Sequence, residues 1–406
     1  MEADFLPYGR QVIDDDDIAA VTEVMRGDWL TTGPTVEAFE AAFAEQVGAK
    51  YAVACSSGTA GLHLLALAVG LGPGDVVVVP TVTFLATANA ARYVGADVVF
   101  ADVDPDTGLM GARQFLEALG RTRPGSVKAV FPVHLNGHSE DMPALRAAAE
   151  GLFVAEDACH ALGGDHLAPT GKMVPVGSCA SSDAAMFSTH PVKAIATGEG
   201  GVLVTNDEEL AAKMRMFRNH GMVREPDRFV NTAMAFEGDE EAAAPWYYEM
   251  RELGFNYRLN DLQCALGISQ LRRLPEFVRK RGALREQYGA LLAGLGPHVR
   301  PIHVAPGCKP AWHLSVALID FKALGTTRTA VMNKLREKGI GTQVHYIPVH
   351  AQPYYCQRYE TPALPGAELY YDRCLSLPLF PSMEEGDVDR VVEILGEVLG
   401  IQVSPL

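Results

Sequence analysis

The sequence predicts an α/β protein with a mainly parallel, mixed sheet covered by helices on both faces. Two observations carry this prediction. Short apolar runs alternate with helical segments from residue 51 to about residue 206, and runs that are apolar throughout are typical of strands buried on both faces. We place a large domain at residues 1–294. A small C-terminal α+β domain is expected at residues 295–406, where strands and helices mix.

The individual elements follow from hydrophobic patterns and boundary residues. Four aspartates, Asp14–Asp17, precede a first helix over 18–25, because negative charge in a first turn complements the helix dipole. A second helix begins near residue 35, and the polar residues 226–244 indicate an exposed insertion. The other predicted elements are strands over 51–55, 76–79, 96–101, 127–133, 152–155, 184–187, 201–205 and 314–319, helices over 60–69, 86–93, 142–150, 327–338 and 385–399, and two long helices between 259 and 292.

Composition and charge exclude several classes of function. The 406 residues carry 34 Lys and Arg against 50 Asp and Glu, a net charge of −16, so we expect neither a nucleic-acid nor an anionic-membrane partner. No apolar run approaches the roughly 20 residues that a membrane span needs. The acidic N-terminus does not resemble a secretory signal, and the seven cysteines form no CxxC pair. A cytoplasmic protein with reduced thiols and no metal site is therefore expected.

The turn after the first predicted strand could bind a phosphate. Ser56-Ser57-Gly58-Thr59-Ala60-Gly61 joins that strand to a helix. Small residues there expose backbone N–H groups at a helix N-terminus, and hydroxyls add further donors. An ordinary capped turn is the alternative, since neither the dinucleotide fingerprint nor the P-loop pattern is present.

Two further features lie at predicted strand ends. Glu156 and Asp157 follow a buried strand, where an acid needs a partner to offset its desolvation; a helix cap is the alternative for Asp157. Lys193 has apolar neighbours that can lower an amine's pKa and make it a nucleophile, although most lysines are solvated surface residues. A phosphate cradle, an anion for a pyridine nitrogen and an amine for an aldehyde are the three needs of pyridoxal 5′-phosphate.

A set of ordered motifs extends this argument over nearly the whole chain. They are Trp29-Leu30-Thr31-Thr32-Gly33-Pro34, Ser57-Gly58-Thr59-Ala60, Glu156-Asp157-Ala158, Phe187-Ser188 with His190-Pro191-Val192-Lys193, Thr197-Gly198-Glu199-Gly200-Gly201, Arg218-Asn219-His220-Gly221-Met222, Gly254-Phe255-Asn256-Tyr257-Arg258-Leu259-Asn260 and Val344-His345-Tyr346-Ile347-Pro348. In these motifs the chain resembles the DegT/StrS-type nucleotide-sugar aminotransferases, a fold-type-I pyridoxal-phosphate family. Within the family it is most similar to the C4 aminotransferases of pseudaminic acid biosynthesis, on Cys159-His160-Ala161-Leu162-Gly163, Gly267-Ile268-Ser269-Gln270-Leu271 and Gln343-Val344-His345-Tyr346.

The resemblance implies a role for each matching residue. Lys193 would form the Schiff base with the cofactor, and Asp157 would pair with the pyridinium nitrogen. The other cofactor contacts would be Thr59, Ala60 and Ser188 on the phosphate, Phe84 stacked on the ring, His160 near the phenolic oxygen, and Asn256 from the neighbouring subunit of a homodimer with shared active sites. The substrate would contact Leu30, Thr32, His220, Arg258, His345 and Tyr346, with Arg218 nearby. For the charged residues among these, a surface charge or a structural hydrogen bond is the alternative.

The implied reaction is amino transfer from L-glutamate to C4 of a UDP-linked 4-ketosugar, with pyridoxamine 5′-phosphate as the intermediate form of the cofactor. The product would be UDP-4-amino-4,6-dideoxy-N-acetyl-β-L-altrosamine. Another nucleotide ketosugar, dTDP- or UDP-linked and 3-keto or 4-keto, is an alternative, as is a non-catalytic pyridoxal-phosphate-binding regulator. A sugar 3-dehydratase of this scaffold carries histidine at the Schiff-base position, so Lys193 argues against it. Thr189 and Cys159 depart from the family pattern, and His134 is expected to line the core.

Overall fold

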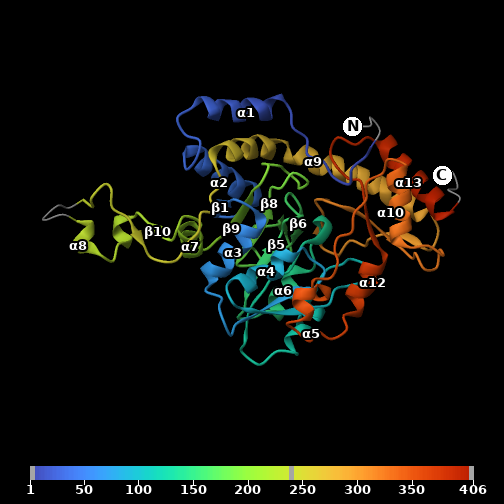
Figure 1. Cartoon of the computed structure of the whole chain (residues 1–406), viewed down its shortest axis with the longest axis horizontal. Helices are drawn as coiled ribbons and strands as arrows, with labels where there is room; N and C mark the ends of the chain where they lie inside the picture. Colours follow the sequence, from blue (N-terminus) through green and yellow to red (C-terminus); the bar gives the residue numbers. More distant parts are fainter. Residues whose placement is uncertain (1–4, 237–241, 402–406) are drawn as a thin grey trace.

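A computed structural model describes residues 5–236 and 242–401. Its centre is a seven-stranded sheet with the order β1-β9-β8-β5-β4-β2-β3 (Figure 1). β9 runs antiparallel to both of its neighbours, and all the other pairs are parallel. The predicted α/β class with a mainly parallel, mixed sheet is therefore confirmed.

The strands of the central sheet are β1 (Tyr51–Cys55), β2 (Val76–Pro80), β3 (Asp97–Ala101), β4 (Val127–Val130), β5 (Phe153–Asp157), β8 (Ala184–Ser188) and β9 (Gly201–Thr205). The remaining strands are β6 (Asp165–Leu167), β7 (Met173–Pro175), β10 (Met222–Val223), β11 (Glu249–Met250), β12 (Val299–Pro301), β13 (Cys308–Lys309), β14 (Ser315–Ile319) and β15 (Cys374–Leu377). The prediction for β4 is wrong at its end, which lies at Val130 and not at residue 133. Pro132 has no N–H with which to continue the ladder.

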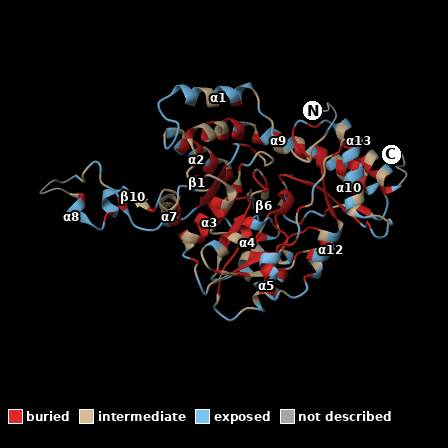
Figure 2. Cartoon of the chain, viewed as in Figure 1, coloured by how far each residue is buried: buried red, intermediate tan, exposed pale blue. Residues whose placement is uncertain are grey.

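The helices are α1 (Asp15–Arg26), α2 (Pro34–Val47), α3 (Gly58–Val69), α4 (Leu85–Tyr93), α5 (Ala112–Leu119), α6 (Met142–Ala148), α7 (Glu208–Arg218), α8 (Thr232–Ala235), α9 (Asp261–Ala293), α10 (Arg328–Glu337), α11 (Pro353–Cys356), α12 (Pro365–Arg373) and α13 (Glu385–Leu399). Short 3₁₀ helices are η1 (Leu135–Gly137), η2 (Pro226–Arg228) and η3 (Val349–Ala351). Side chains of α3, α4 and α7 cover one face of the sheet, and those of α2, α5, α6 and α9 cover the other. Figure 2 shows the buried residues concentrated between these layers.

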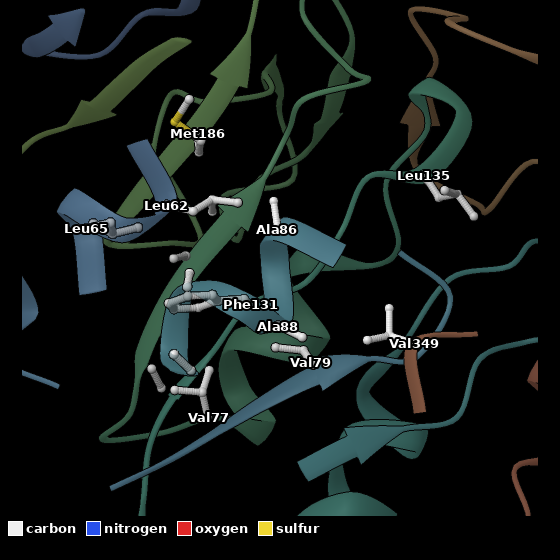
Figure 3. Close-up of a cluster of buried hydrophobic side chains, with 14 of the residues drawn as sticks. Leu62, Leu65, Val77, Val79, Ala86, Ala88, Phe131, Leu135, Met186 and Val349 are labelled. Carbon is white, nitrogen blue, oxygen red and sulfur yellow. The ribbon is translucent and has the colours of Figure 1, made fainter. Parts of the chain in front are cut away.

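Buried side chains between α3 and the central sheet fix the position of the start of this helix. Leu62 and Leu65 of α3 lie in the same buried cluster as Met186 of β8 (Figure 3). Gly61 allows this approach, because a Cβ at that position would lie 2.3 Å from the sulfur of Met186. The first turn of α3 and the end of β8 are thereby held next to each other.

The two long helices predicted between 259 and 292 are one continuous helix, α9, with Pro275 inside it. A proline in a helix removes one backbone hydrogen bond and crowds the preceding turn, at a cost of about 3 kcal/mol. Packing on both sides of Pro275 offsets this cost: α9 contacts α1 and α2 as well as β12, β14 and α13. It runs beneath α1 and extends to the C-terminal helices α10 and α13 (Figure 1).

The C-terminal part has its own sheet and its own apolar cluster. β12, β14 and β15 form an antiparallel sheet, and α10 and α13 pack beside it. Leu284, Tyr288 and Leu292, from the second half of α9, belong to the same cluster. The boundary at residues 294 and 295 stays a prediction.

The first residues of the chain connect this C-terminal part to α9. The backbone of Leu6 pairs with Gly339 and Gly341 at 2.9 and 2.7 Å. The predicted acidic first turn is present, since Asp14 and Asp17 form a capping box at the start of α1. Asp17 is also buried and accepts a hydrogen bond from Gln270 of α9 at 2.6 Å. The segment between Leu6 and Asp17 is therefore held at both ends, and it contains Tyr8.

The predicted insertion is an arm that projects from the body near α7 (Figure 1). β10, η2, α8 and β11 belong to it, while residues 237–241 lie outside the described part of the chain. Phe229 and Ala235 are buried in a small apolar cluster within the arm. The Glu249 carboxylate accepts hydrogen bonds from the N–H groups of Val230 and Asn231. The arm therefore has internal order of its own.

Two further observations bear on the expected environment of the protein. All seven cysteines are free thiols. Within residues 5–236 and 242–401, no helix combines the length and the apolar character required to cross a bilayer. A cytoplasmic location stays a prediction.

Candidate active site

A cavity of about 500 Å³ lies at the carboxyl ends of the central strands, which is where α/β sheets bind their ligands. It brings together these predicted site residues: Thr59, Phe84, Asp157, His160, Ser188, Lys193, His345 and Tyr346. Most of them come from loops and helices that follow β1, β2, β5 and β8. His345 and Tyr346 come from the C-terminal part, so the cavity lies between the two parts of the molecule.

Lys193 lies in the loop after β8 with its amine free. The backbone N–H of Lys193 donates to the His190 carbonyl at 2.8 Å, and the Arg281 side chain donates to the Lys193 carbonyl at 3.1 Å. Nζ makes no hydrogen bond or ion pair with any residue that the structure describes. Burial lowers the pKa of Lys193, while the nearby Cys159 and Asp157 act in the opposite direction. Lys193 is therefore not a solvated surface lysine, and its neutral form is more accessible than that of an ordinary lysine.

The two acids at the end of β5 point to opposite sides, as successive strand residues do. Asp157 lines the cavity, accepts a hydrogen bond from the Thr87 hydroxyl at 2.6 Å, and is only 6% exposed. No helix follows β5 directly, so the helix-cap interpretation does not apply. Asp157 is an acceptor with capacity for a further donor in the cavity.

Glu156 belongs to a buried network behind the cavity. One of its oxygens lies 2.7 Å from Nε2 of His134, and the other accepts a hydrogen bond from the Ser182 hydroxyl at 2.5 Å. Burial alone would raise the pKa of Glu156, but the hydrogen bonds from His134 and Ser182 and the charge of His134 bring it below its ordinary value. His134 is 1% exposed and does not line the cavity, as expected of a core residue.

The start of α3 forms a cradle of donors. The Ser57 hydroxyl caps the helix by accepting from the Ala60 N–H at 3.1 Å. The N–H groups of Gly58 and Thr59 donate to no described residue. Ser188 approaches from β8, since a Cβ on Gly58 would lie 3.3 Å from the Ser188 Cβ. The free N–H groups of Gly58 and Thr59 and the hydroxyls of Thr59 and Ser188 suit a phosphate. The Ala60 N–H already donates to the Ser57 hydroxyl, and Ala60 does not line the cavity.

Gly201 of β9 keeps this cradle in place, and its replacement by alanine is a test. A Cβ there would lie 2.7 Å from the Ser57 carbonyl oxygen, and that backbone atom cannot move without displacing the cap. We expect Gly201→Ala to lower the free energy of unfolding by about 1–3 kcal/mol and to weaken phosphate binding. Urea denaturation and phosphate titration measure both effects. Gly72→Ala is the control, because no atom lies within 4 Å of its Cβ; equal stability of the two variants would contradict the argument.

The opposite wall of the cavity is aromatic. Phe84 is 55% exposed, and its ring centroid lies 5.9 Å from that of Tyr346, which leaves a face free for a planar ligand. Burial lowers the pKa of His345 to about 3, and the charge of Lys193 adds to the effect. The pKa of His160 and that of His313 are also well below the ordinary value, chiefly because of burial. These imidazoles are therefore neutral near pH 7.

Several predicted residues do not line this cavity in the single chain: Ala60, Leu30, Thr32, His220, Asn256 and Arg258. Leu30 and Thr32 lie in an exposed loop that is held by Asp261, which accepts from the Gly33 N–H at 2.8 Å. Arg258 donates to Asn219 at 2.7 Å, and Arg218 donates to Glu40 at 2.5 Å. Arg218 and Arg258 therefore make structural hydrogen bonds within the chain. The predicted ligand contacts of this group stay predictions.

Sequence analysis assigned no role to Tyr8, Thr87, His313 or Gln343, all of which lie at or against this cavity. Thr87 had a usable signal, because it lies in the first turn of α4, three residues after Phe84, so its hydroxyl faces the same strand ends. Gln343 belongs to the motif Gln343-Val344-His345-Tyr346, which gave it no role. Tyr8 and His313 come from distant segments with no recognisable pattern.

The comparisons agree with this geometry. The model of the DegT/DnrJ/EryC1/StrS aminotransferase family matches residues 11–396. The spore coat polysaccharide biosynthesis protein SpsC of Bacillus subtilis (strain 168) is 41% identical over 400 residues, which cover 97% of each chain. PseC of Helicobacter pylori, an aminotransferase of pseudaminic acid biosynthesis, superposes with a TM-score of 0.84 at 29% identity, covering 98% of this chain and 99% of PseC.

A third relative is DesI, solved in the presence of its TDP-sugar product, with a TM-score of 0.82 and 31% identity over 98% of this chain and 94% of DesI. These structural matches confirm the predicted fold of a fold-type-I aminotransferase. The family match covers far more than half of the chain. The chain therefore belongs to the DegT/DnrJ/EryC1/StrS aminotransferase family, and it is a sugar aminotransferase whose cofactor is pyridoxal 5′-phosphate.

Proposed function

We propose that the protein transfers an amino group from L-glutamate to C4 of a UDP-linked 4-keto-6-deoxy-N-acetylhexosamine. The product would be UDP-4-amino-4,6-dideoxy-N-acetyl-β-L-altrosamine, as in pseudaminic acid biosynthesis. The observation that carries the chemistry is the unpartnered Lys193 amine in a cavity that also holds Asp157 and the α3 cradle. The similarity to PseC over nearly the whole chain supports this choice of sugar.

The cavity residues fit the cofactor on three counts. The free N–H groups of Gly58 and Thr59, with the hydroxyls of Thr59 and Ser188, would hold the phosphate. Asp157 would accept a hydrogen bond from the protonated pyridine nitrogen, because the Thr87 hydroxyl and the Cys159 N–H leave acceptor capacity free on the carboxylate. Phe84 would cover one face of the ring. When bound, pyridoxal 5′-phosphate supplies an electron sink and a carrier for the amino group.

Lys193 and Asp157 divide the chemical work. The neutral Lys193 amine would take the proton from Cα of glutamate and, in the second half of the reaction, deliver a proton to C4 of the sugar. A base with a lowered pKa suits this task because it is available without prior deprotonation at high pH. The Asp157 carboxylate would keep the pyridine nitrogen protonated through a charge-assisted hydrogen bond.

Product identification tests the substrate. Purified enzyme would be incubated with L-glutamate and a panel of UDP- and dTDP-linked ketosugars, and the products analysed by NMR and mass spectrometry. We expect the fastest amination at C4 of the UDP-linked sugar. Preference for a dTDP-linked sugar would favour the second candidate, an enzyme acting like DesI, whose TDP-sugar product motivates it. Absence of the glutamate half-reaction would favour a regulator.

Asn256 tests the proposed homodimer with shared sites. Its side chain is exposed and makes no hydrogen bond to a described residue, so we expect Asn256→Ala to leave the free energy of unfolding unchanged. If Asn256 completes the phosphate site of the partner, the variant should lose cofactor about 10-fold faster, as expected for one lost hydrogen bond to a charged group. Dialysis followed by absorbance gives the rate. Asn333→Ala, an exposed position on α10, is the matched control.

Subunit mixing makes this test sharper. A hybrid of one Lys193→Ala chain and one Asn256→Ala chain contains one intact site if Asn256 serves the partner, and none if it serves its own chain. Activity that appears on mixing two weak variants would support sharing. Activity that remains at the average of the two parents would contradict it.

A further inference from the structure

His160 is fixed in one tautomer by its two neighbours. Its Nδ1 lies 3.3 Å from the backbone nitrogen of Asn136, and its Nε2 lies 3.2 Å from the Tyr346 hydroxyl. A backbone N–H can only donate, so Nδ1 must be the unprotonated acceptor. The imidazole is neutral, because burial holds its pKa well below the ordinary value. The single ring proton is therefore on Nε2, and it is donated to the Tyr346 oxygen.

The anchor of this arrangement is rigid. Asn136 is fully buried, its carbonyl accepts the N–H of His313 at 3.0 Å, and its side-chain amide donates to Tyr370 at 3.2 Å. The ring of His313 packs against that of His160 with 4.4 Å between centroids. The other tautomer would place a proton on Nδ1 against the Asn136 N–H, and rotation of the ring by 180° would place Cδ2 there without an acceptor. The direction of the hydrogen bond to Tyr346 is therefore set by the backbone.

A consequence follows for the Tyr346 hydroxyl. Its oxygen accepts from His160, so its own proton must point elsewhere, and no other described residue accepts it. Burial and the nearby Asp157 and Cys159 raise the pKa of Tyr346 well above its ordinary value, so the proton is retained. Tyr346 lines the same cavity as Lys193 and Asp157, and its O–H is a donor available to whatever binds there.

We propose that Tyr346 donates a hydrogen bond to an acceptor oxygen of the bound ligand and that His160 is the positioning residue that keeps Tyr346 in this donor orientation. The acceptor is either the phenolic oxygen of the cofactor or the carbonyl oxygen of the ketosugar. The assignment differs from the predicted direct contact of His160 with the phenolic oxygen. The proposal rests on the proposed function, which places both the cofactor and the sugar in this cavity. The measurement on the bound cofactor needs no sugar, so its outcome does not depend on which sugar is the substrate.

Tyr346→Phe separates the two acceptors. The first readout, without any sugar, is the pH midpoint of the bound cofactor's visible absorption change. If the phenolic oxygen is the acceptor, loss of the donor makes that oxygen more basic and raises the midpoint by about one pH unit. If the sugar carbonyl is the acceptor, the midpoint is unchanged, the glutamate half-reaction keeps its rate, and kcat with the ketosugar falls about 10- to 100-fold. An unchanged midpoint together with unchanged kcat overturns the proposal.

His160 variants test the positioning role. The amide of His160→Gln can accept from the Asn136 N–H and donate to Tyr346, so it should retain most of the wild-type behaviour. His160→Leu should reproduce the effect of Tyr346→Phe and add less than about 2-fold in the Tyr346→Phe background, because no hydroxyl is left to orient. Effects that multiply in the double variant overturn the coupling. If His160→Leu does not fold, His160→Ala, which also removes the ring N–H, gives the same comparison in the wild-type and Tyr346→Phe backgrounds.

Tyr354→Phe is the matched control. Tyr354 is 54% exposed and lies outside the cavity, so loss of its hydroxyl should change neither readout. A change as large as that in Tyr346→Phe would show that the readouts do not report on the cavity, and it would overturn the assignment.

Discussion

Lys193→Ala should remove turnover almost completely, by more than about 1,000-fold, because it removes the amine that moves protons in both half-reactions. The free energy of unfolding should change little, since Nζ has no partner among the described residues and burial disfavours its charged form. Steady-state kinetics with L-glutamate and a ketosugar measure the first effect, and urea denaturation measures the second.

Two control variants isolate the amine. Lys193→Arg keeps a positive charge but cannot act as a neutral base or nucleophile, so it should be as inactive as the alanine variant. Lys213→Ala, on the exposed side of α7, should retain wild-type activity. Borohydride reduction of the holoenzyme should label position 193. Turnover in Lys193→Ala, or a label at another residue, would contradict the assignment.

Asp157→Asn should reduce the rate roughly 100- to 1,000-fold, because a neutral amide cannot hold a proton on the pyridine nitrogen as a carboxylate does. Cofactor binding should be partly retained, because the cradle at α3 is untouched. The amide is the same size as the carboxylate, and the Thr87 hydroxyl can still donate to its oxygen. Kinetics and equilibrium cofactor titration separate the two quantities.

Glu156→Gln is the matched control one residue away. Glu156 points away from the cavity and forms hydrogen bonds with His134 and Ser182. This variant should therefore lower the free energy of unfolding by about 1–3 kcal/mol and leave the rate of the folded enzyme unchanged. A rate loss in Glu156→Gln that matches that of Asp157→Asn would show that charge near β5, and not contact with the cofactor, is responsible.

The part of the site that sequence could predict is the part built at strand ends. Asp157 is the last residue of β5, the turn at Ser57 follows β1, and Lys193 lies in the loop after β8. Parallel strands bring such residues to one edge of a sheet. The hydrogen bond between His160 and Tyr346 joins positions 186 residues apart, and no local pattern reports it. Tyr8 is held at the cavity by the C-terminal part of the chain, since its carbonyl accepts the Leu379 N–H at 3.1 Å, and no local pattern reports this contact either.

The fold shows the same division between local and tertiary information. The strands of the central sheet were predicted from short apolar runs, because these patterns are local, whereas the helices α5, α7 and α12 were not predicted. Two helices were expected between 259 and 292, and they are one because packing on both sides of Pro275 stabilises the continuous α9. Sequence reports the local preference for a break, and only the tertiary structure shows the packing that opposes it.

The continuous α9 has a consequence for how the protein can be divided. A fragment ending at residue 294 would present Leu284, Tyr288 and Leu292 to water without the C-terminal strands and helices that cover them. Tyr288 would also lose the Pro378 carbonyl to which its hydroxyl donates at 2.9 Å. The smallest autonomous folding unit therefore contains both parts, and truncated versions made for crystallisation or expression should keep the chain intact across this helix.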